Sequence, residues 1–370
     1  MHSSLKELAL LFTRLGITGF GGPAVHIAMM EDEVVRKRKW MTAEHFLDLV
    51  GATNLIPGPN STELTMHIGL ERAGWKGLVV AGCCFIFPAV VITAIIAWAY
   101  QQYGMLPQVQ QFIYGIKPAI IAVIVSLMIR LGAKALKTWE LGVIGLMAAV
   151  AVLAGFNEIL VLFAGGIAGI IIYAIKNQGK KLHGFLPFVF LQVSQPPVNL
   201  SDLKLFFIFL KIGSILYGSG YVLFAFLDAE LVSKGWLSSQ QLVDSIAVGQ
   251  FTPGPVFSSA TFIGWQLGGA GGAIAATIGI FLPSFLFVAF LNPLVARLRK
   301  SRIMSAFLDA VNIVSIAIIL SVIVELGRSA MQDWKSILIA VMGFAVSFYF
   351  RKLNTAWVIL GGALMGYLLL

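Results

Sequence analysis

The sequence "NLIPGPNSTEL", Asn54 to Leu64, interrupts a chain that otherwise has the composition of a membrane protein. Two prolines and a glycine at positions 57–59 end one helix and allow another to begin. The same interruption returns as "QFTPGPVFSSA", Gln250 to Ala260. Unpaired backbone groups are costly in a bilayer and are tolerated mainly where they line a cavity. Two matching breaks therefore predict that both segments serve a function.

The composition predicts an all-α polytopic membrane protein. The chain has 370 residues, of which 58% are hydrophobic and only 12% are charged. Its first segment, from Leu5, carries Lys6 and Arg14 and lacks a cleavage site, so we expect it to be retained and not removed as a signal peptide. The apolar runs that reach or approach bilayer-spanning length are 78–100, 118–129, 141–154, 159–175, 273–291 and 336–350.

The chain contains an internal repeat. An offset of 196 residues aligns Trp40 with Trp236 and the motif at 57–59 with the motif at 253–255. Offsets of 195 and 197 align further residues on either side, so one register with single-residue slips covers about a third of the chain. This pattern predicts two homologous halves.

The basic residues predict how the first half crosses the membrane, because cytoplasmic loops collect Lys and Arg. With the basic clusters inside, segment 5–30 is a span that ends inside, and 42–70 enters and leaves on the inner face. The segment 42–70 is therefore predicted to be a re-entrant hairpin with its tip at 57–59. The basic clusters of this half lie at 36–39, 72–76, 130–137 and 176–181. Because the +9 net charge is largely explained by these loops, nucleic acid is not an expected partner.

Because the first half has an odd number of crossings, five, the second half has the opposite orientation in the membrane. A second hairpin at about 238–268 is therefore predicted to enter from outside. The predicted fold is an all-α polytopic membrane protein with two inverted-topology repeats, each of about five transmembrane helices plus one re-entrant helical hairpin. The repeats cover 1–180 and 201–370, joined by a cytoplasmic linker at 181–200. Both termini are predicted outside the cell membrane. Such repeats are typical of secondary transporters with a midplane site, and a channel or scaffold made by duplication is the alternative.

The broken segments have the chemistry of an anion site. A helix start presents free N–H groups and a partial positive charge, and hydroxyl and amide side chains around both tips can donate hydrogen bonds. Two inverted hairpins would aim two helix starts at one small anion. The candidate substrate-binding residues are Arg14, Gly21, Gly22, Asn54, Gly58, Asn60, Ser61, Thr62, Lys211, Gly218, Ser219, Gln250, Thr252, Gly254, Ser258 and Ser259.

Several of these residues belong to the glycine-rich first segments, "GITGFGGPAVH" at 16–26 and "YGSGY" at 217–221. The glycines favour either close helix packing or a binding wall made of backbone. Arg14 and Lys211 occupy matching repeat positions in these segments. Cations within a membrane favour a functional role, and snorkelling toward an interface is the alternative.

Glu63 is the acidic residue closest to a hairpin tip. Its position favours one of two roles: a carboxylate that couples transport to protons, or an acid that caps the first turn of a helix. Together with His67, four residues along the same helix face, it is also the one pair that an embedded enzyme or lipid scramblase could use. The second half has no such pair, and the sequence has no Walker loop, CxxC motif or Ser/His/Asp spacing. We therefore expect no enzyme, no metal and no cofactor.

Taken together, "GFGGP" at 19–23, the two "PGP" hairpins, and "FIFP" and "IFLP", ending at Pro88 and Pro283, resemble the chromate ion transporter family in its long two-domain form. The resemblance covers essentially the whole chain, and "YGSGY" departs from "GFGGP" in the second half. It implies export of chromate, a tetrahedral dianion, from the cytoplasm across the cell membrane.

The runner-up substrate is sulfate or another oxyanion, by uptake or exchange, because sulfate has the same charge and a similar shape. A dianion leaving a negative interior gains about 4.6 kcal/mol per 100 mV, so export needs no ATP. The working hypothesis places the anion between the two hairpin tips, with Arg14 or Lys211 as the counter-charge. The expected partners are the oxyanion and the lipid bilayer. A homodimer is the remaining alternative to a monomer, although the inverted fusion does not require it.

Overall fold

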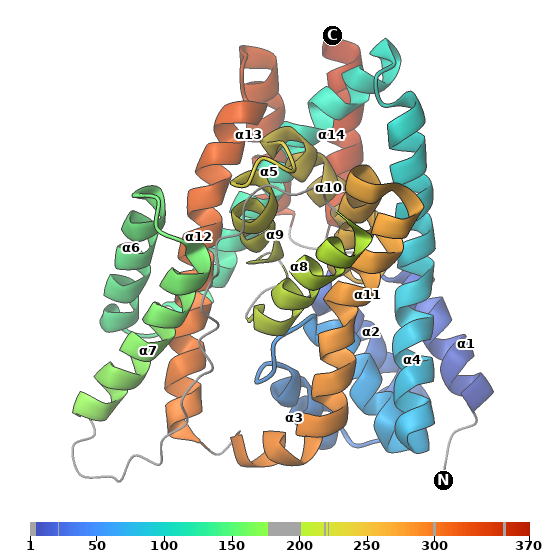
Figure 1. Cartoon of the computed structure of the whole chain (residues 1–370), viewed down its shortest axis with the longest axis vertical. Coiled ribbons are helices and arrows are strands. Elements are labelled where there is room, and N and C mark those ends of the chain that lie inside the picture. The colour runs from blue at the N-terminus through green and yellow to red at the C-terminus, as the bar shows by residue number, and fades with distance from the viewer. Residues whose placement is uncertain are drawn as a thin grey trace.

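The computed structural model describes residues 5–20, 22–176, 201–217, 220, 222–298, 301–350 and 353–370, and throughout these ranges the regular structure is helical. Figure 1 shows the arrangement. In the first half the helices are α1 (Leu5–Thr18), α2 (Pro23–Glu31), η1 (Asp32–Lys37), α3 (Ala43–Thr53), α4 (Asn60–Tyr103), α5 (Pro107–Ala135), α6 (Trp139–Leu153) and α7 (Glu158–Lys176). In the second half they are α8 (Asp202–Ile215), α9 (Val222–Leu227), η2 (Asp228–Val232), α10 (Ser239–Phe251), η3 (Val256–Ser258), α11 (Ser259–Leu298), α12 (Arg302–Ala330), α13 (Trp334–Tyr349) and α14 (Thr355–Leu369).

The expectation of a single span over 5–30 is wrong, because this segment is two helices that fold back on each other. Glu7 near the start of α1 forms an ion pair with Arg38, just after η1, at 3.2 Å. Further along, Arg14 of α1 pairs with Glu33 of η1 at 2.7 Å. The two helices are therefore antiparallel. The break comes at Gly22, whose φ of 83° few other residues adopt, and α2 begins directly after it with a proline.

The second half begins with the same kind of helix pair. Lys204 at the start of α8 lies over the ring of Trp236, which follows η2, at 4.4 Å. Lys211 of α8 pairs with Glu230 of η2 at 2.6 Å. Each half thus opens with two short helices that start and finish at the same end of the molecule.

The helices on either side of each PGP motif also run antiparallel. Thr42 caps the start of α3, and His45 in its first turn contacts Glu71 of α4 at 2.7 Å, so the motif lies at the far end of the pair. The matching helix α10 begins with a capping box made by Ser238 and Gln241. The sequence predicted both breaks where the structure has them.

Both long helices that follow the motifs contain a sharp kink. In α4 the helix is interrupted at Gly74, with φ 60° and ψ −150°, and in α11 it is interrupted at Gly269, with φ 60° and ψ −148°. Only glycine adopts this backbone conformation without strain. The kinks separate a short helix after each motif from a long helix that continues the chain. Two equal backbone distortions 195 residues apart agree with the sequence repeat.

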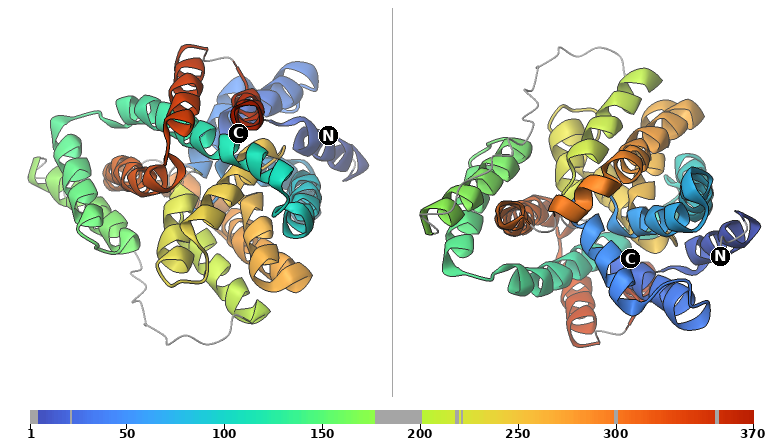
Figure 2. Two further views of the ribbon diagram at one scale, coloured as in Figure 1. Left: turned by 90° about the horizontal axis from the view of Figure 1, so that it is seen from above. Right: turned by 90° about the horizontal axis from the view of Figure 1, so that it is seen from below.

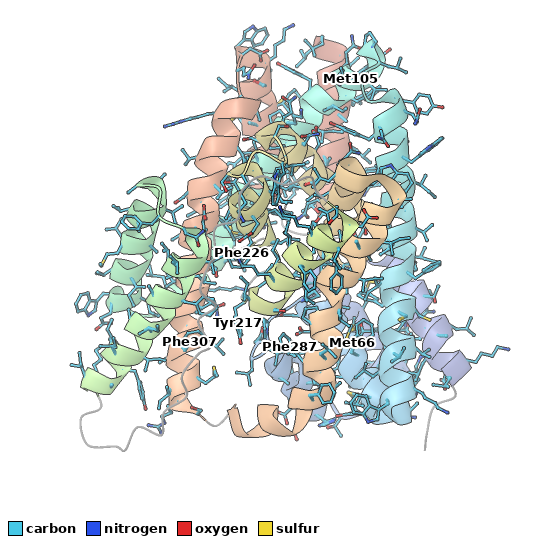
Figure 3. The ribbon with its side chains drawn as sticks, in the orientation of Figure 1. Met66, Met105, Tyr217, Phe226, Phe287 and Phe307 are labelled. Carbon is cyan, nitrogen blue, oxygen red and sulfur yellow. The ribbon has the colours of Figure 1, made fainter. Side chains whose placement is uncertain are left out.

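The two halves pack closely through small residues. Gly115 of α5 lies against Gly362 and Gly366 of α14, and α4 packs against α11. Figure 2 shows α6 and α7 at one side of the molecule, where they pack against α12. Phe226 of α9 is completely buried near the centre, whereas Met105, after α4, is exposed at the upper end (Figure 3).

Within the described ranges, five helices are long and apolar enough to cross a membrane. They lie at 60–103, 109–135, 158–176, 256–290 and 302–328, and α6, α13 and α14 are shorter apolar helices. Large apolar side chains such as Phe87, Leu146 and Leu368 are exposed on their outer faces, as expected for helices that contact lipid.

The start of α1 and the C-terminus lie at opposite ends of the molecule, which we call the lower and upper ends as in Figure 1. At the lower end, Arg38 pairs with Glu7. At the upper end, the Lys335 amine donates a hydrogen bond to the Leu369 carbonyl, and α14 contacts the start of α5. The prediction placed both termini on the same side, whereas here the first segment folds back and the two ends of the chain lie at opposite ends of the molecule.

The predicted linker at 181–200 lies outside the described residues. The helices before and after it are at different ends. Lys176 at the end of α7 pairs with Glu140 at the lower end, and Asp202 at the start of α8 lies against the α11 kink at Gly268 and Gly271 at the upper end. This arrangement differs from the expectation that the second half begins on the side where the first half finishes.

Candidate functional site

A cavity of about 710 Å³ lies between the two halves, toward the lower end of the molecule. Part of its wall comes from the last turns of α5 and the first turns of α12, which meet where Lys137 pairs with Asp309 at 2.6 Å. The lining residues are Pro23, Ala24, Asn54, Pro59, Asn60, Ser61, Leu127, Arg130, Leu131, Lys134, Ala135, Lys137, Gly220, Pro255, Val256, Phe257, Asp309, Asn312, Ser315 and Ile316.

Four helix breaks, those after α1 and α8 and the two PGP motifs, contribute to the wall of this cavity. Pro23 and Ala24 begin α2, and residues 59–61 begin α4. Residues 255–257 lead into α11, and Gly220 lies in the break between α8 and α9. Helix starts carry free N–H groups and the positive end of the helix dipole. The cavity therefore concentrates hydrogen-bond donors and partial positive charge.

Each PGP tip is held by the first helix pair of the other half. The Gly58 amide donates a hydrogen bond to the Leu216 carbonyl at 2.9 Å, and the Gly254 amide donates one to the Gly19 carbonyl at 2.8 Å. A Cβ atom on Gly58 would collide with Glu63 Oε1 and the Ser284 hydroxyl. These reciprocal contacts place the two tips across the boundary between the halves.

The side of the cavity formed by α5 is basic. Arg130, Lys134 and Lys137 line it, while Asp309 is the one carboxylate among the described lining residues. Lys137 is neutralised by Asp309, so two cations remain in excess. A cavity wall of one charge sign raises the local concentration of oppositely charged solutes. The electrostatics therefore favour an anion.

Three of the sequence-predicted residues lie at this cavity. Asn54, Asn60 and Ser61 line it, and the Asn60 amide donates a hydrogen bond to Asn54 Oδ1 at 2.6 Å. Ser61 Oγ shares a hydrogen bond with His26 Nδ1 at 3.2 Å. Gly22, another predicted residue, is the residue from which α2 begins, next to the lining residue Pro23.

Other predicted residues lie behind the tips and do not line the cavity. Thr62, Gln250 and Ser259 are buried, and one polar side-chain atom of each has no hydrogen-bond partner among the described residues. The Thr252 hydroxyl donates to the Val248 carbonyl. Gly254 and Ser258 are buried as well, with Gly254 in the tip contact described above and Ser258 accepting a hydrogen bond from Thr93. Gly21, Gly218 and Ser219 lie outside the described residues.

Arg14 and Lys211 are not brought to the cavity. Arg14 pairs with Glu33, and Lys211 pairs with Glu230, each within its own half. Both glutamates are buried, with 7% of Glu33 and 2% of Glu230 exposed. Burial raises the pKa of the Glu33 carboxyl, hydrogen bonds from Lys37 and Arg14 lower it, and the net pKa lies below its ordinary value.

Glu63 is completely buried beside the first tip. Neither of its carboxylate oxygens has a hydrogen-bond partner of good geometry in the described part of the chain, and the same holds for His67 Nε2 one turn further along α4. The aligned residue in the second half is Ser259, so this feature is not symmetric.

The basic residues of α5 and the polar residues Asn312 and Ser315 of α12 were missed as site residues. The cluster at 130–137 was visible in the sequence, but it was interpreted only as a marker of the cytoplasmic side. Neutral residues such as Asn312 and Ser315 give no comparable signal, because polar side chains also occur on helices that only pack.

The all-helical fold, the apolar spans and the central cavity define a multi-pass membrane protein built from two related halves. The chain belongs to the chromate transporter family, whose model matches residues 6–170 and again 203–367. This membership confirms the resemblance seen in the sequence, and it identifies a transporter and not an enzyme.

Curated relatives match over nearly the whole chain. A probable chromate transport protein of Synechococcus elongatus is 30% identical over 98% of this chain and 95% of its own length. Chromate transport proteins of Cupriavidus metallidurans and Pseudomonas aeruginosa are 28% and 29% identical, over 98% and 99% of this chain and 92% of their own length in both cases. No solved structure matches the chain.

Proposed function

We propose that the protein is a secondary transporter that exports chromate from the cytoplasm by alternating access. The observation that carries this proposal is the cavity in which the four helix breaks and the basic face of α5 come together. Its helix starts and amide and hydroxyl groups are hydrogen-bond donors, and chromate offers only acceptor oxygens. The names of the curated relatives support chromate as the oxyanion.

The proposed membrane arrangement puts the lower end of the molecule in the cytoplasm. Arg36, Arg72, Lys134 and Lys176 all belong to loops or helix ends there, in agreement with the preference of cytoplasmic loops for basic residues. In this orientation each half has two re-entrant helix pairs followed by four crossing helices, and the second half is inverted. The repeats cover 1–180 and 201–370. The cavity of this structure then faces the cytoplasm.

Export is the favourable direction for a dianion. Moving two negative charges out of a cell with a negative interior releases about 4.6 kcal/mol per 100 mV, whereas uptake would need coupled cations or exchange. Glu63 is the residue through which proton coupling would operate, because it is a buried carboxylate beside the first tip.

Chromate uptake into inside-out membrane vesicles tests this function, because their outer surface is the cytoplasmic face. We expect the protein to accumulate chromate when the vesicle interior is made positive, and unlabelled sulfate to compete if the site recognises only charge and shape. Vesicles from cells without the protein are the control. No uptake above that control would contradict chromate transport, and uptake of sulfate alone would assign the second candidate.

A further inference from the structure

A buried ion pair lies on the upper side of the molecule, away from the cavity. Lys117 of α5 lies 3.3 Å from Asp244 of α10, and the Tyr100 hydroxyl donates a hydrogen bond of 2.6 Å to the second oxygen of the same carboxylate. Only 7% of Lys117 and 5% of Asp244 are exposed. Burying such a pair costs about as much as it gains, so stability alone is a weak reason to keep it. Ionisable groups at membrane depth more often serve a function.

This contact joins the two halves of the chain. Lys117 and Tyr100 belong to the first half, and Asp244 belongs to the helix that precedes the second PGP motif. Along this face α10 packs against α5. The ion pair thus holds the second tip-bearing segment against a helix of the other half.

The repeat relates this closed contact to the open cavity. An offset of 195 aligns Lys117 with Asn312, and an offset of 196 aligns Asp244 with Asp48. Asn312 is exposed and lines the cavity, whereas Lys117 is buried. Equivalent positions are therefore open at the lower end and closed at the upper end. If the two halves exchanged conformations, the Lys117 side would open and the Asn312 side would close.

We infer that Lys117 is an anion-binding residue of the outward-open state, and that Asp244 and Tyr100 form the outer gate that covers it in this structure. This inference deepens the proposed function and rests on it for the identity of the anion. When the gate opens, Lys117 loses its carboxylate partner, and an oxyanion can take the place of the carboxylate at the ammonium group. When the gate closes, Asp244 competes for the same cation and favours release of the anion.

Cysteine accessibility tests the gate without any substrate. In a background with Cys83→Ser and Cys84→Ser, Asn312→Cys reports on the lower side. Ile121→Cys, aligned with the lining residue Ile316, reports on the upper side. Adding Asp244→Asn should raise maleimide labelling of Ile121→Cys from outside and lower labelling of Asn312→Cys from the cytoplasmic face. The expected change is about fivefold or more, as for typical coupling between conformational states.

The matched control is Glu140→Gln, which removes a carboxylate that pairs with Lys176 at the lower membrane edge and should change neither reporter. Unchanged labelling at both reporters in Asp244→Asn would overturn the gate. A rise at both would also overturn it, because that result indicates local unfolding and not an exchange of sides.

Transport by the neutral pair tests the role of Lys117 itself. The double variant Lys117→Gln/Asp244→Asn leaves no unpaired buried charge, so we expect a folded protein whose chromate uptake is reduced about tenfold or more. The single variant Lys117→Arg should retain uptake, because the cation remains. Wild-type uptake by the double variant would show that the pair is only structural. If the wild-type protein itself takes up no chromate, the proposed function fails, while the labelling result still decides the gate.

Discussion

At the scale of single residues, the cations fall into two groups. Arg14 and Lys211 carry a buried glutamate as their partner, whereas Arg130 and Lys134 face the cavity and have no carboxylate partner within the described residues. The sequence drew attention to the first group because its members repeat. The second group lines the cavity and does not repeat, so a comparison of the halves does not find it.

The double variant Arg130→Gln/Lys134→Gln should weaken anion capture. Removing both unpaired cations lowers the local anion concentration, so we expect the KM for chromate uptake to rise by about tenfold at low salt and by less at high salt. Initial uptake rates in inside-out vesicles measure this effect. Lys335→Gln, which removes a cation at the upper end, is the matched control. An unchanged KM in the double variant would rule out a role for the basic wall.

Arg14→Gln should affect stability slightly and leave chromate affinity unchanged. Glu33 keeps Lys37 at 2.9 Å and Arg38 at 3.5 Å, and the Arg14 side chain is 54% exposed, so the expected loss is below about 1 kcal/mol. Thermal unfolding of the detergent-purified protein and the KM for uptake measure the two quantities. A large rise in KM with normal stability would restore Arg14 as the counter-charge of the anion.

Among the helices, the kinks at Gly74 and Gly269 determine the path of the chain, because each redirects the chain from a short helix into the long helix that follows it. Gly74→Ala should destabilise the protein by about 1–3 kcal/mol through backbone strain alone. No neighbouring atom would touch the added Cβ, so steric collision is not the cause. Thermal unfolding measures the change.

Gly361→Ala is the matched control for this prediction. Its Cβ would also meet no neighbour, but Gly361 has an ordinary helical backbone in α14, so alanine should be neutral or slightly stabilising. Equal stability of the two variants would contradict the strain assigned to the kink.

The elements around the PGP motifs could be predicted from the sequence, and the first helix pairs could not. Pro and Gly at 57–59 and 253–255 leave no continuous helix as an alternative. The length and apolar content of segment 5–30 fit one crossing helix as well as they fit two short helices that fold back on each other. The distinguishing signal is local: Gly22 followed by Pro23 has the pattern of a new helix start.

At the scale of the whole molecule, the repeat was predictable, but its conformational asymmetry was not. Offsets in the sequence identify aligned residues such as Lys117 and Asn312, yet the two are opposite in exposure. This difference arises from how the halves are packed in one state, and a linear pattern contains no information on which side is open.

Protection of Asn312→Cys by chromate tests whether the oxyanion occupies the cavity between the helix breaks. The measurement is the rate of maleimide labelling in inside-out vesicles, in the cysteine-substituted background, with increasing chromate. We predict a saturable decrease in rate with a midpoint close to the KM for uptake, and no decrease for a cysteine at Glu44, an exposed residue in the first turn of α3 at the same lower end. Labelling of Asn312→Cys that is independent of chromate, in a variant that still transports it, would contradict the account.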